Sequence, residues 1–590
     1  MSPATEPASA VPGPAIRARD LRKSFRRETG EIVKALDGIS LDVKPGTLAA
    51  LVGPDGAGKT TLIRLITGLM PADSGTLTVL ATDVGRDPQS VQDRVGYMPQ
   101  KFGLYEDLSV QENLDLYADL HGIGKAERAQ RYPELFAMTA LGPFTARLAG
   151  RLSGGMKQKL GLACTLIGSP SLLLLDEPTV GVDPLSRREL WEIIHSLVEK
   201  QHLTVLLSTS YLDEAEHCHE AFVLREGKVL AQGPPATVGA LAEGHVFRLV
   251  PPPGQAARDL QAKLLDDPGT IDAVPEGGCV RLVRAEGRGG GESGATPVAA
   301  RFEDGFMTLL KRNQQSAPAA AAMSFQRHIT SPGDKPIIRV KDLLRKFGSF
   351  TAVDHVSFEV RGGEIFGLLG PNGAGKTTTF RMLCGLLPAT SGTLDVAGFD
   401  LRRARASARQ RIGYVAQKFA LYGQLTVTQN LEFFASAYGL EASRKRERVA
   451  WALDQFELRP LMQLPSGQLP GGYKQRLAMA AALLHEPEIL FLDEPTSGAD
   501  PLARREFWRR ITALSSQGVT VIVTTHFMEE AEYCDRIAIL DGGRILAQGT
   551  PAEVRGLAPA SPEHEPDMED AFIAVVAQAR DHAHAAASRA

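Results

Sequence analysis

Short apolar runs separated by helix-like segments dominate the first part of the chain. The runs at Leu48–Val52, Leu172–Leu175 and Thr204–Thr209 have the length and composition of buried strands. Strands that are apolar on both faces are typical of parallel sheets, which helices cover on both sides. The pattern therefore predicts an α/β fold with a largely parallel sheet in each half of the chain.

The second half of the chain repeats the first. The segment Gly53–Thr61 recurs as Gly370–Thr378 after 317 positions, and Asp176 and Asp493 keep the same separation. An alignment that holds over this distance without net insertion indicates an internal duplication. We therefore predict two similar domains, at residues 16–240 and 337–555.

Extra residues follow the first repeat. Alternating, helical and strand-like patterns occur there in turn, at residues 245–250, 256–265 and 279–283. They predict a small β/α appendage over residues 245–312. Residues 313–336 are rich in Ala, Pro and Ser and are expected to be a linker, and residues 556–590 a C-terminal helical tail.

Composition and charge exclude several classes of protein. The chain has 590 residues, of which 43% are hydrophobic and 23% charged, as in a globular protein of several domains. No apolar run approaches the about 18 residues that span a bilayer, and the N-terminus has no signal-peptide pattern. The net charge of −4 gives no electrostatic argument for a nucleic-acid partner.

Each repeat carries a glycine-rich pattern for binding nucleotide phosphates. It follows a predicted strand and precedes a helix-like segment, where backbone N–H groups can surround phosphate oxygens. Lys59 is expected to reach the outer phosphates, and the Thr60 hydroxyl to bind Mg²⁺. The predicted positions are Gly53, Gly56, Gly58, Lys59, Thr60 and Thr61 in the first repeat, and Gly370, Gly373, Gly375, Lys376, Thr377 and Thr378 in the second.

Two acidic pairs stand at the ends of predicted buried strands. Asp176-Glu177 follows the run of leucines in the first half, and Asp493-Glu494 occupies the same place in the second. The aspartates are expected to hold Mg²⁺, and the glutamates to polarise a water molecule for attack on the γ-phosphate.

Between these motifs lies LSGGMKQ at residues 152–158, with LPGGYKQ at residues 469–475. The first resembles the LSGGQ signature of the ATP-binding cassette (ABC) ATPases. Gln100 and Gln417 match the Q-loop of that family, and His526 matches its switch histidine, while residues 181–183 and 498–500 match its D-loop. The resemblance covers about residues 16–235 and 337–555, with the motifs in the order of the family.

The resemblance implies more than the motifs do alone. In this family two cassettes pair head to tail, and each ATP lies between the phosphate loop of one cassette and the signature of the other. Ser153, Gly154, Gly155, Gly471 and Gly472 would then bind ATP, and Gln100 and Gln417 would join Thr60, Asp176, Thr377 and Asp493 around Mg²⁺. Phe25 and Phe347 stand where the family places an aromatic residue that stacks on adenine, although each could instead be a core residue.

Two departures from the family pattern fall in one of the paired sites. Ser210 stands where the second half has His526, and Pro470 stands where the first half has Ser153. A serine hydroxyl is too short to replace an imidazole at the γ-phosphate, and proline offers neither hydroxyl nor N–H. We expect Glu494 and His526 to form the hydrolytic site, and Glu177 to belong to a degenerate one; two equivalent sites are the alternative.

Three functions are open to such a chain. Residues 100–114 and 417–431 are similar to the segments that dock a permease helix in bacterial drug-type exporter ATPases. This resemblance implies the ATPase of a multidrug or cation exporter, held at the cytoplasmic face of the inner membrane by two transmembrane permease subunits, with a periplasmic adaptor protein as an optional partner. The main alternative is a translation factor that acts on the ribosome, which would carry a long charged helical linker. A DNA-repair cassette protein would need zinc cysteines or a coiled coil.

Overall fold

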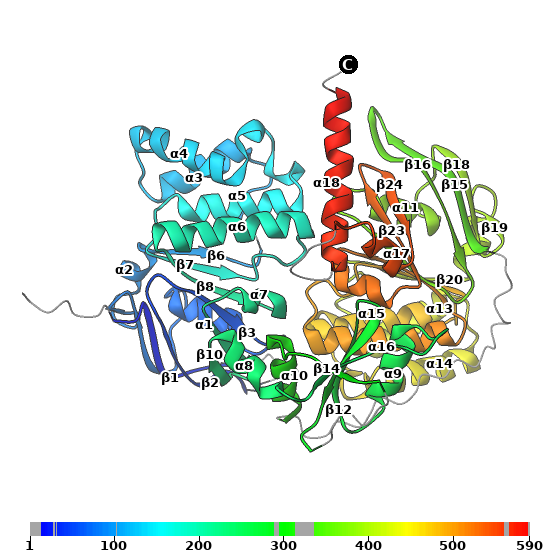
Figure 1. The fold of residues 1–590 in the computed structure, drawn as a ribbon, viewed down its shortest axis with the longest axis horizontal. Helices are drawn as coiled ribbons and strands as arrows, with labels where there is room; N and C mark the ends of the chain where they lie inside the picture. The colour runs from blue at the N-terminus through cyan, green and yellow to red at the C-terminus, as the bar shows by residue number, and fades with distance from the viewer. Residues whose placement is uncertain are drawn as a thin grey trace, which may run out of the picture. The chain divides into compact units, whose positions relative to one another are not determined.

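The computed structural model describes residues 13–26, 30, 32–101, 103–287, 294–312, 336–559 and 566–587 (Figure 1). The chain divides into two compact units. One contains the residues up to Val180 together with Arg188–Gly239, and the other contains Gly181–Arg187 and the residues from Ala240 onward. The predicted linker, except Pro336, lies outside the described residues.

Two sheets form the first unit. Their strand orders are β2-β1-β4-β5, which is antiparallel, and β10-β9-β3-β8-β7-β6, in which only β10 is antiparallel to its neighbour. The strands are β1 (Ile16–Arg26), β2 (Ile32–Val43), β3 (Leu48–Val52), β4 (Ser74–Val79), β5 (Thr82–Asp83), β6 (Val95–Met98), β7 (Leu172–Asp176), β8 (Thr204–Thr209), β9 (Glu220–Arg225) and β10 (Lys228–Gly233). The three apolar runs are thus buried parallel strands, as predicted.

The helices of the first unit are α1 (Lys59–Ile66), α2 (Pro88–Gln92), α3 (Val110–Leu120), α4 (Lys125–Thr139), η1 (Gly142–Phe144), η2 (Ala149–Arg151), α5 (Gly154–Leu166), α6 (Pro184–Gln201, from Arg188 onward in this unit), α7 (Leu212–Glu216) and α8 (Pro235–Gly239). Helices α3, α4 and α5 share a core of their own and lie together, away from β1 and β2 (Figure 1). A capping box starts α3, in which Ser109 Oγ accepts from the Glu112 N–H at 3.2 Å and Glu112 accepts from the Ser109 N–H at 2.7 Å.

The second unit contains the same two sheets, ordered β16-β15-β18-β19 and β20-β21-β22-β17-β23-β24. The strands are β15 (Pro336–Phe347), β16 (Phe350–Arg361), β17 (Ile365–Leu369), β18 (Ser391–Val396), β19 (Phe399–Asp400), β20 (Ile412–Val415), β21 (Ile489–Asp493), β22 (Thr520–Thr525), β23 (Arg536–Asp541) and β24 (Arg544–Gly549). The duplication in sequence is therefore a duplication of fold.

The helices that follow these strands are α11 (Lys376–Leu383), α12 (Arg405–Arg409), α13 (Val427–Ala437), α14 (Ala442–Gln455), η4 (Arg459–Leu461), η5 (Ser466–Gln468), α15 (Gly471–Leu483), α16 (Pro501–Ser516), η6 (Met528–Tyr533), α17 (Pro551–Arg555) and α18 (Met568–Ala587). Among the described residues, no helix is both long enough and apolar enough to cross a membrane.

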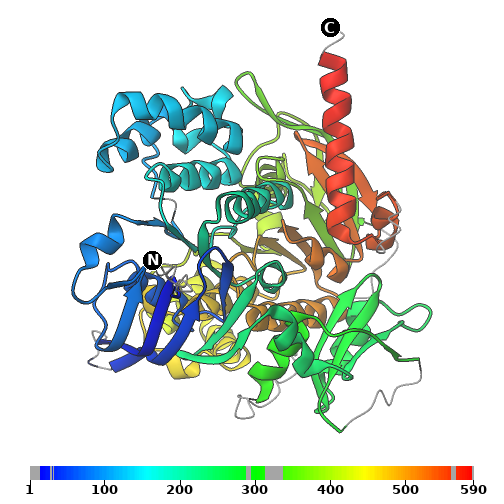
Figure 2. The ribbon, with the colours of Figure 1, turned by 60° about the vertical axis from the view of Figure 1, so that its left-hand side comes forward.

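A third, antiparallel sheet belongs to the second unit, although it follows the first cassette in the chain (Figure 2). Its order is β12-β13-β11-β14, and α9 packs on it through an apolar core. The elements are η3 (Ala240–Ala242), β11 (Val246–Leu249), α9 (Ala257–Leu265), β12 (Thr270–Glu276), β13 (Cys279–Arg284), β14 (Thr296–Pro297) and α10 (Phe302–Arg312). The sequence patterns predicted β11, α9 and β13 but missed β12 and β14. We call residues 240–312 the accessory domain.

Candidate nucleotide sites

The first phosphate loop joins β3 to α1 and needs glycine for steric reasons. Gly58, directly before α1, has φ +104°, and a Cβ there would lie 2.5 Å from the carbonyl oxygen of Ala35. A Cβ on Gly53 would lie 2.2 Å from the carbonyl oxygen of Leu224. The loop can therefore run close to the sheet and turn its backbone N–H groups toward a ligand.

Lys59 lies folded back over this loop. Its Nζ donates to the carbonyl oxygens of Gly53 at 2.7 Å and Pro54 at 3.3 Å, and lies 3.7 Å from Glu177 Oε1. The lysine side chain is 6% exposed. A buried ammonium held by two carbonyl oxygens and one carboxylate is poised to transfer its hydrogen bonds to phosphate oxygens.

The strand-end aspartate has one satisfied oxygen and one open oxygen. Asp176 Oδ1 accepts from Thr60 Oγ1 at 3.1 Å and from Ser208 Oγ at 2.6 Å. Asp176 Oδ2 is buried and has no hydrogen-bond partner among the described residues. A hydroxyl beside a carboxylate oxygen with a free lone pair is a suitable donor set for Mg²⁺.

The sequence analysis missed Ser208. It lies in β8, where its Oγ also accepts from the N–H of Glu177 at 3.0 Å and so links the two acidic residues. Thr524 occupies the same place in the second unit, accepting from the Glu494 N–H at 2.9 Å and donating to Asp493 Oδ1 at 2.7 Å. The sequence contains a signal for these two residues, because a hydroxyl residue follows the apolar residues in each of the strands β8 and β22.

The second phosphate loop repeats this geometry. Lys376 Nζ donates to the carbonyl oxygens of Gly370 at 2.6 Å and Pro371 at 3.1 Å, and lies 3.8 Å from Glu494 Oε1. Each Q-loop glutamine reaches the glutamate of its own unit: Gln417 Nε2 donates to Glu494 at 2.7 Å, and Gln100 Nε2 donates to Glu177 at 2.5 Å. The structure thus brings together the predicted lysine, glutamine and acidic pair in each unit.

The two sites differ beside the glutamate. His526 Nδ1 lies 3.2 Å from Glu494 Oε2, and both side chains are buried. This is a close approach of the two groups, since neither ring nitrogen of His526 makes a hydrogen bond among the described residues. In the first unit Ser210 is also buried, and its Oγ likewise has no hydrogen-bond partner among the described residues. The serine therefore does not replace the contact that the imidazole makes with the carboxylate.

The pKa values of the two glutamates are shifted in opposite directions. Burial raises the pKa of Glu177 above its ordinary value, and the charges of Asp55 and Asp176 add to this effect against Lys59. Burial would also raise the pKa of Glu494, but His526, followed by Lys376 and Gln417, brings it below the ordinary value. Glu494 is held more firmly as an ionised carboxylate than Glu177.

The signature residues lie apart from these clusters within each unit, at the start of α5 and of α15. Ser153 caps α5 by accepting from the N–H of Met156 at 3.3 Å, an interaction worth about 1 kcal/mol. Pro470 precedes α15 without any side-chain cap, yet the helix forms. Proline thus preserves the helix, as expected, while removing the hydroxyl.

The two aromatic residues predicted to stack on adenine end their strands at the surface. Phe25 is 40% exposed near the end of β1, and Phe347 is 46% exposed at the end of β15. The guanidinium of Arg345 lies 4.4 Å from the ring centre of Phe347. Their exposure argues against a core role.

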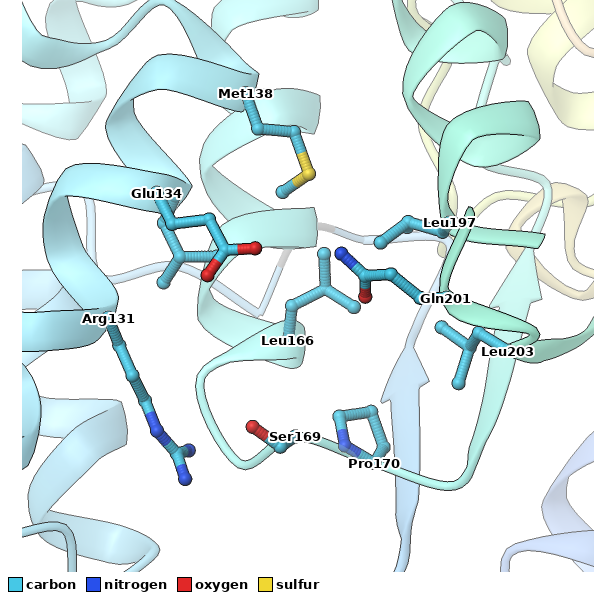
Figure 3. A pocket seen from close by; sticks show the side chains of 10 residues that line it. Arg131, Glu134, Met138, Leu166, Ser169, Pro170, Leu197, Gln201 and Leu203 are labelled. Atoms are coloured by element: carbon cyan, nitrogen blue, oxygen red, sulfur yellow. The ribbon is translucent and has the colours of Figure 1, made fainter. Parts of the chain in front are cut away.

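A cavity of about 170 Å³ in the first unit lies outside the predicted nucleotide motifs. It separates α4 from the end of α6, and Figure 3 shows Glu134 and Met138 facing Leu197 and Gln201 across it. Its lining includes no residue of the phosphate loop, acidic pair or signature. We therefore assign the cavity to the boundary between the sheet and the helical part of the cassette, by which we mean helices α3, α4 and α5.

Comparison with known proteins decides the family. The model of the ABC transporter family matches residues 36–180 and 353–497. A protein of Escherichia coli named "Probable multidrug ABC transporter ATP-binding protein YbhF" is 48% identical over 570 residues, which cover 95% of this chain and 97% of that protein. The chain belongs to the ABC transporter family. This ABC protein binds ATP and is an ATPase that works with transmembrane permease components, as the resemblance of its motifs implied.

Shorter relatives match one cassette of this ABC ATPase. "Nod factor export ATP-binding protein I" of Ralstonia nicotianae is 44% identical over 223 residues, which cover 38% of this chain and 70% of that protein. "Linearmycin resistance ATP-binding protein LnrL" of Bacillus subtilis is 41% identical over 219 residues, which cover 37% of this chain and 70% of that protein. The Escherichia coli relative differs from both, because its match covers both cassettes of this chain.

Proposed function

We propose that this chain is the ATP-hydrolysing subunit of a membrane exporter for drugs or cations. The similarity to YbhF supports this most directly, because it extends over both cassettes and the accessory domain. The domain boundaries 16–240, 245–312, 313–336, 337–555 and 556–590 are part of the proposal. The ribosomal alternative receives no support from the relatives described above.

Each site would hold MgATP through its own cluster of residues. The phosphate loop would bind the phosphates with Lys59 or Lys376, and Phe25 or Phe347 would stack on adenine. Thr60, Gln100 and Asp176 would hold Mg²⁺ in the first site, and Thr377, Gln417 and Asp493 in the second. The chemistry that Mg²⁺ supplies when bound is neutralisation of charge on the outer phosphates.

The hydrolytic step would belong mainly to the second cassette. Glu494, kept ionised by His526, would accept a proton from the attacking water, while Lys376 stabilises charge on the γ-phosphate. Glu177 would support slow turnover or none. In head-to-tail pairing, Ser153, Gly154 and Gly155 would complete the site of Lys376, and Gly471 and Gly472, preceded by Pro470, would complete the site of Lys59.

ATP would drive the exporter by favouring the state in which the cassettes are closed. A ligand shifts such an equilibrium by its difference in affinity for the two states, and ATP would contact both cassettes only when they are closed. Two permease subunits would receive this motion and hold the chain at the cytoplasmic face of the inner membrane. A periplasmic adaptor could complete the pathway.

Affinity purification of the tagged chain from detergent-solubilised membranes tests this function. We expect two multi-span permease subunits per chain, lost when residues 100–114 or 417–431 are exchanged for segments of a shorter relative. A matched exchange of strands β4 and β5, which lie outside both segments, should retain them. Recovery of ribosomes instead of membrane proteins would contradict the exporter function.

A further inference from the structure

Within the second unit, the accessory domain packs directly on the second cassette. Its helix α9 contacts α16 and η6, and its strand β12 contacts η6 (Figure 2). η6 begins at Met528, two residues after His526, and α16 begins at Pro501, directly after the D-loop segment. The covered surface is therefore continuous in the chain with His526 and with the D-loop segment of the second cassette.

The contact at the end of η6 is a polar cluster that is largely buried. Arg258 Nη1 donates to the carbonyl oxygen of Tyr533 at 3.1 Å, and Arg258 Nη2 lies 2.8 Å from Asp535 Oδ1. Gln261, which is fully buried, donates from Nε2 to Tyr533 Oη at 3.3 Å. These bonds hold both the backbone and the side chain at the end of η6, which a nonspecific apolar contact would not do.

The contact with α16 consists of ion pairs. Arg505 Nε lies 3.3 Å from Asp272 Oδ2 on β12, and Arg505 also pairs with Glu303 on α10. Arg509, one helical turn further, pairs with Asp266. Arg505 and Asp272 are 8% and 4% exposed, and a buried charge that loses its partner is strongly unfavourable. The pairing therefore fixes the orientation of the accessory domain on this cassette.

Hydrogen bonds continue from η6 to the hydrolytic residues. Buried Glu530, in η6, accepts from Thr525 Oγ1 at 2.7 Å and from Thr496 Oγ1. Thr525 directly precedes His526, and Thr496 is two residues beyond Glu494. A shift of η6 would therefore move the backbone next to both members of the His526–Glu494 pair.

The first cassette lacks one carboxylate of this docking surface and uses the arginine differently. His219 stands where the second cassette has Asp535, so the carboxylate that holds the accessory arginine is missing. Arg188, the counterpart of Arg505, has a side chain that is 62% exposed and lies 3.6 Å from Glu192 of the same helix. The accessory domain is thus matched to the cassette that carries the switch histidine.

We propose that the accessory domain is a built-in positioning element for the second nucleotide site. By holding η6 and α16, it fixes His526 against Glu494 and so sets the rate of the hydrolytic step. Arg258 is the principal positioning residue, acting through Tyr533 and Asp535 without touching ATP. The inference rests on the proposed assignment of hydrolysis to Glu494 and His526.

Steady-state ATPase kinetics of the full chain test this inference. We expect Arg258→Ala to lower kcat on the order of ten-fold, while KM for MgATP and the melting temperature stay close to wild type. Arg258→Lys, which keeps the charge near Asp535, should restore part of the rate. Asp535→Asn removes the same ion pair from the cassette side, and combining it with Arg258→Ala should add little further loss. Arg188→Ala, on the first cassette, is the matched control and should leave kcat unchanged.

The outcomes separate this inference from the assignment on which it rests. If Glu494→Gln abolishes turnover but Arg258→Ala and Asp535→Asn keep the wild-type kcat, the positioning role is wrong and the assignment stands. A fall in melting temperature and ATP affinity in parallel with kcat for both variants would mean a structural role only, and would also overturn the inference. If Glu494→Gln leaves turnover intact, the assignment and the inference both fail.

Discussion

The two nucleotide sites share a phosphate cradle and differ at the residue beside the glutamate. In both units the lysine, the Q-loop glutamine and the hydroxyl residue on the neighbouring strand make equivalent hydrogen bonds. His526 nevertheless brings the pKa of Glu494 below its ordinary value, whereas burial leaves the pKa of Glu177 raised. The cradle alone therefore does not determine the direction of the glutamate pKa shift, which depends on one further side chain.

A second difference lies at the boundary between the sheet and the helical part. The first unit has a cavity there, bordered by Arg131, Glu134 and Ser169. In the second unit Arg448 stacks on Trp451 at 3.8 Å from the ring centre and lies 3.2 Å from Glu486. The side chains at this place in the second unit therefore contact one another directly, which the cavity-lining residues of the first unit do not do across the cavity.

The largest expected effect separates the two glutamates. Glu494→Gln should lower ATPase kcat about 100-fold or more, because it removes the proton acceptor. Glu177→Gln should change kcat by less than about two-fold, because we propose that the site that lacks the switch histidine contributes little turnover. Measurement of kcat for each variant at saturating MgATP checks the comparison. Equal losses would show two equivalent sites.

An intermediate effect should follow from restoring the missing imidazole. In the Glu494→Gln background, Ser210→His should raise the residual rate on the order of ten-fold, since the new imidazole would hold Glu177 ionised. Adding Glu177→Gln should remove the gain, which a phosphate-release assay can detect. Ser210→Ala is the control: the serine Oγ has no partner among the described residues, so we expect neither a gain in rate nor a loss of stability. A gain with alanine would contradict the role of the imidazole.

The smallest effect concerns acid stability and should be confined to the second unit. Burial, followed by the charge of Arg448, lowers the pKa of His485 from 6.5 to about 4, although a hydrogen bond with the Ile412 carbonyl opposes this. The folded state therefore favours the neutral ring. The stabilising contribution of the neutral His485 ring is complete above pH 6.5 and is lost as the pH falls toward about 4.

This loss should reach about 3 kcal/mol in the free energy of unfolding. Denaturant titrations followed by tryptophan fluorescence at several pH values measure it, because Trp451 lies in the same helical part. The His485→Asn variant should lose this pH dependence. The first unit has Gly168 at the corresponding position and should not show it. If the free energy of unfolding of the variant changes with pH as in the wild type, the acid sensitivity arises from other groups.

Local motifs predicted most of each cassette. The elements that they missed depend on contacts between residues that are distant in the chain. The runs that became β3, β7 and β8, the helix after each phosphate loop and the helix after Pro470 follow from contiguous residues, because strand and helix signals act over a few positions. Strands β12 and β14 were missed, since each is short or irregular and is stabilised by a neighbour distant in the chain.

The sequence by itself determined that the chain carries two cassettes, where their phosphate loops and acidic pairs lie, and that Ser210 and Pro470 depart from the pattern. These properties depend on residue type and spacing, which duplication preserved. Only the tertiary structure decided that Ser208 links Asp176 to Glu177 and that His526 reaches Glu494. It also placed the accessory domain on the second cassette through residues more than 200 positions apart. Such contacts depend on which buried charges find partners during packing, and this is not encoded in any local pattern.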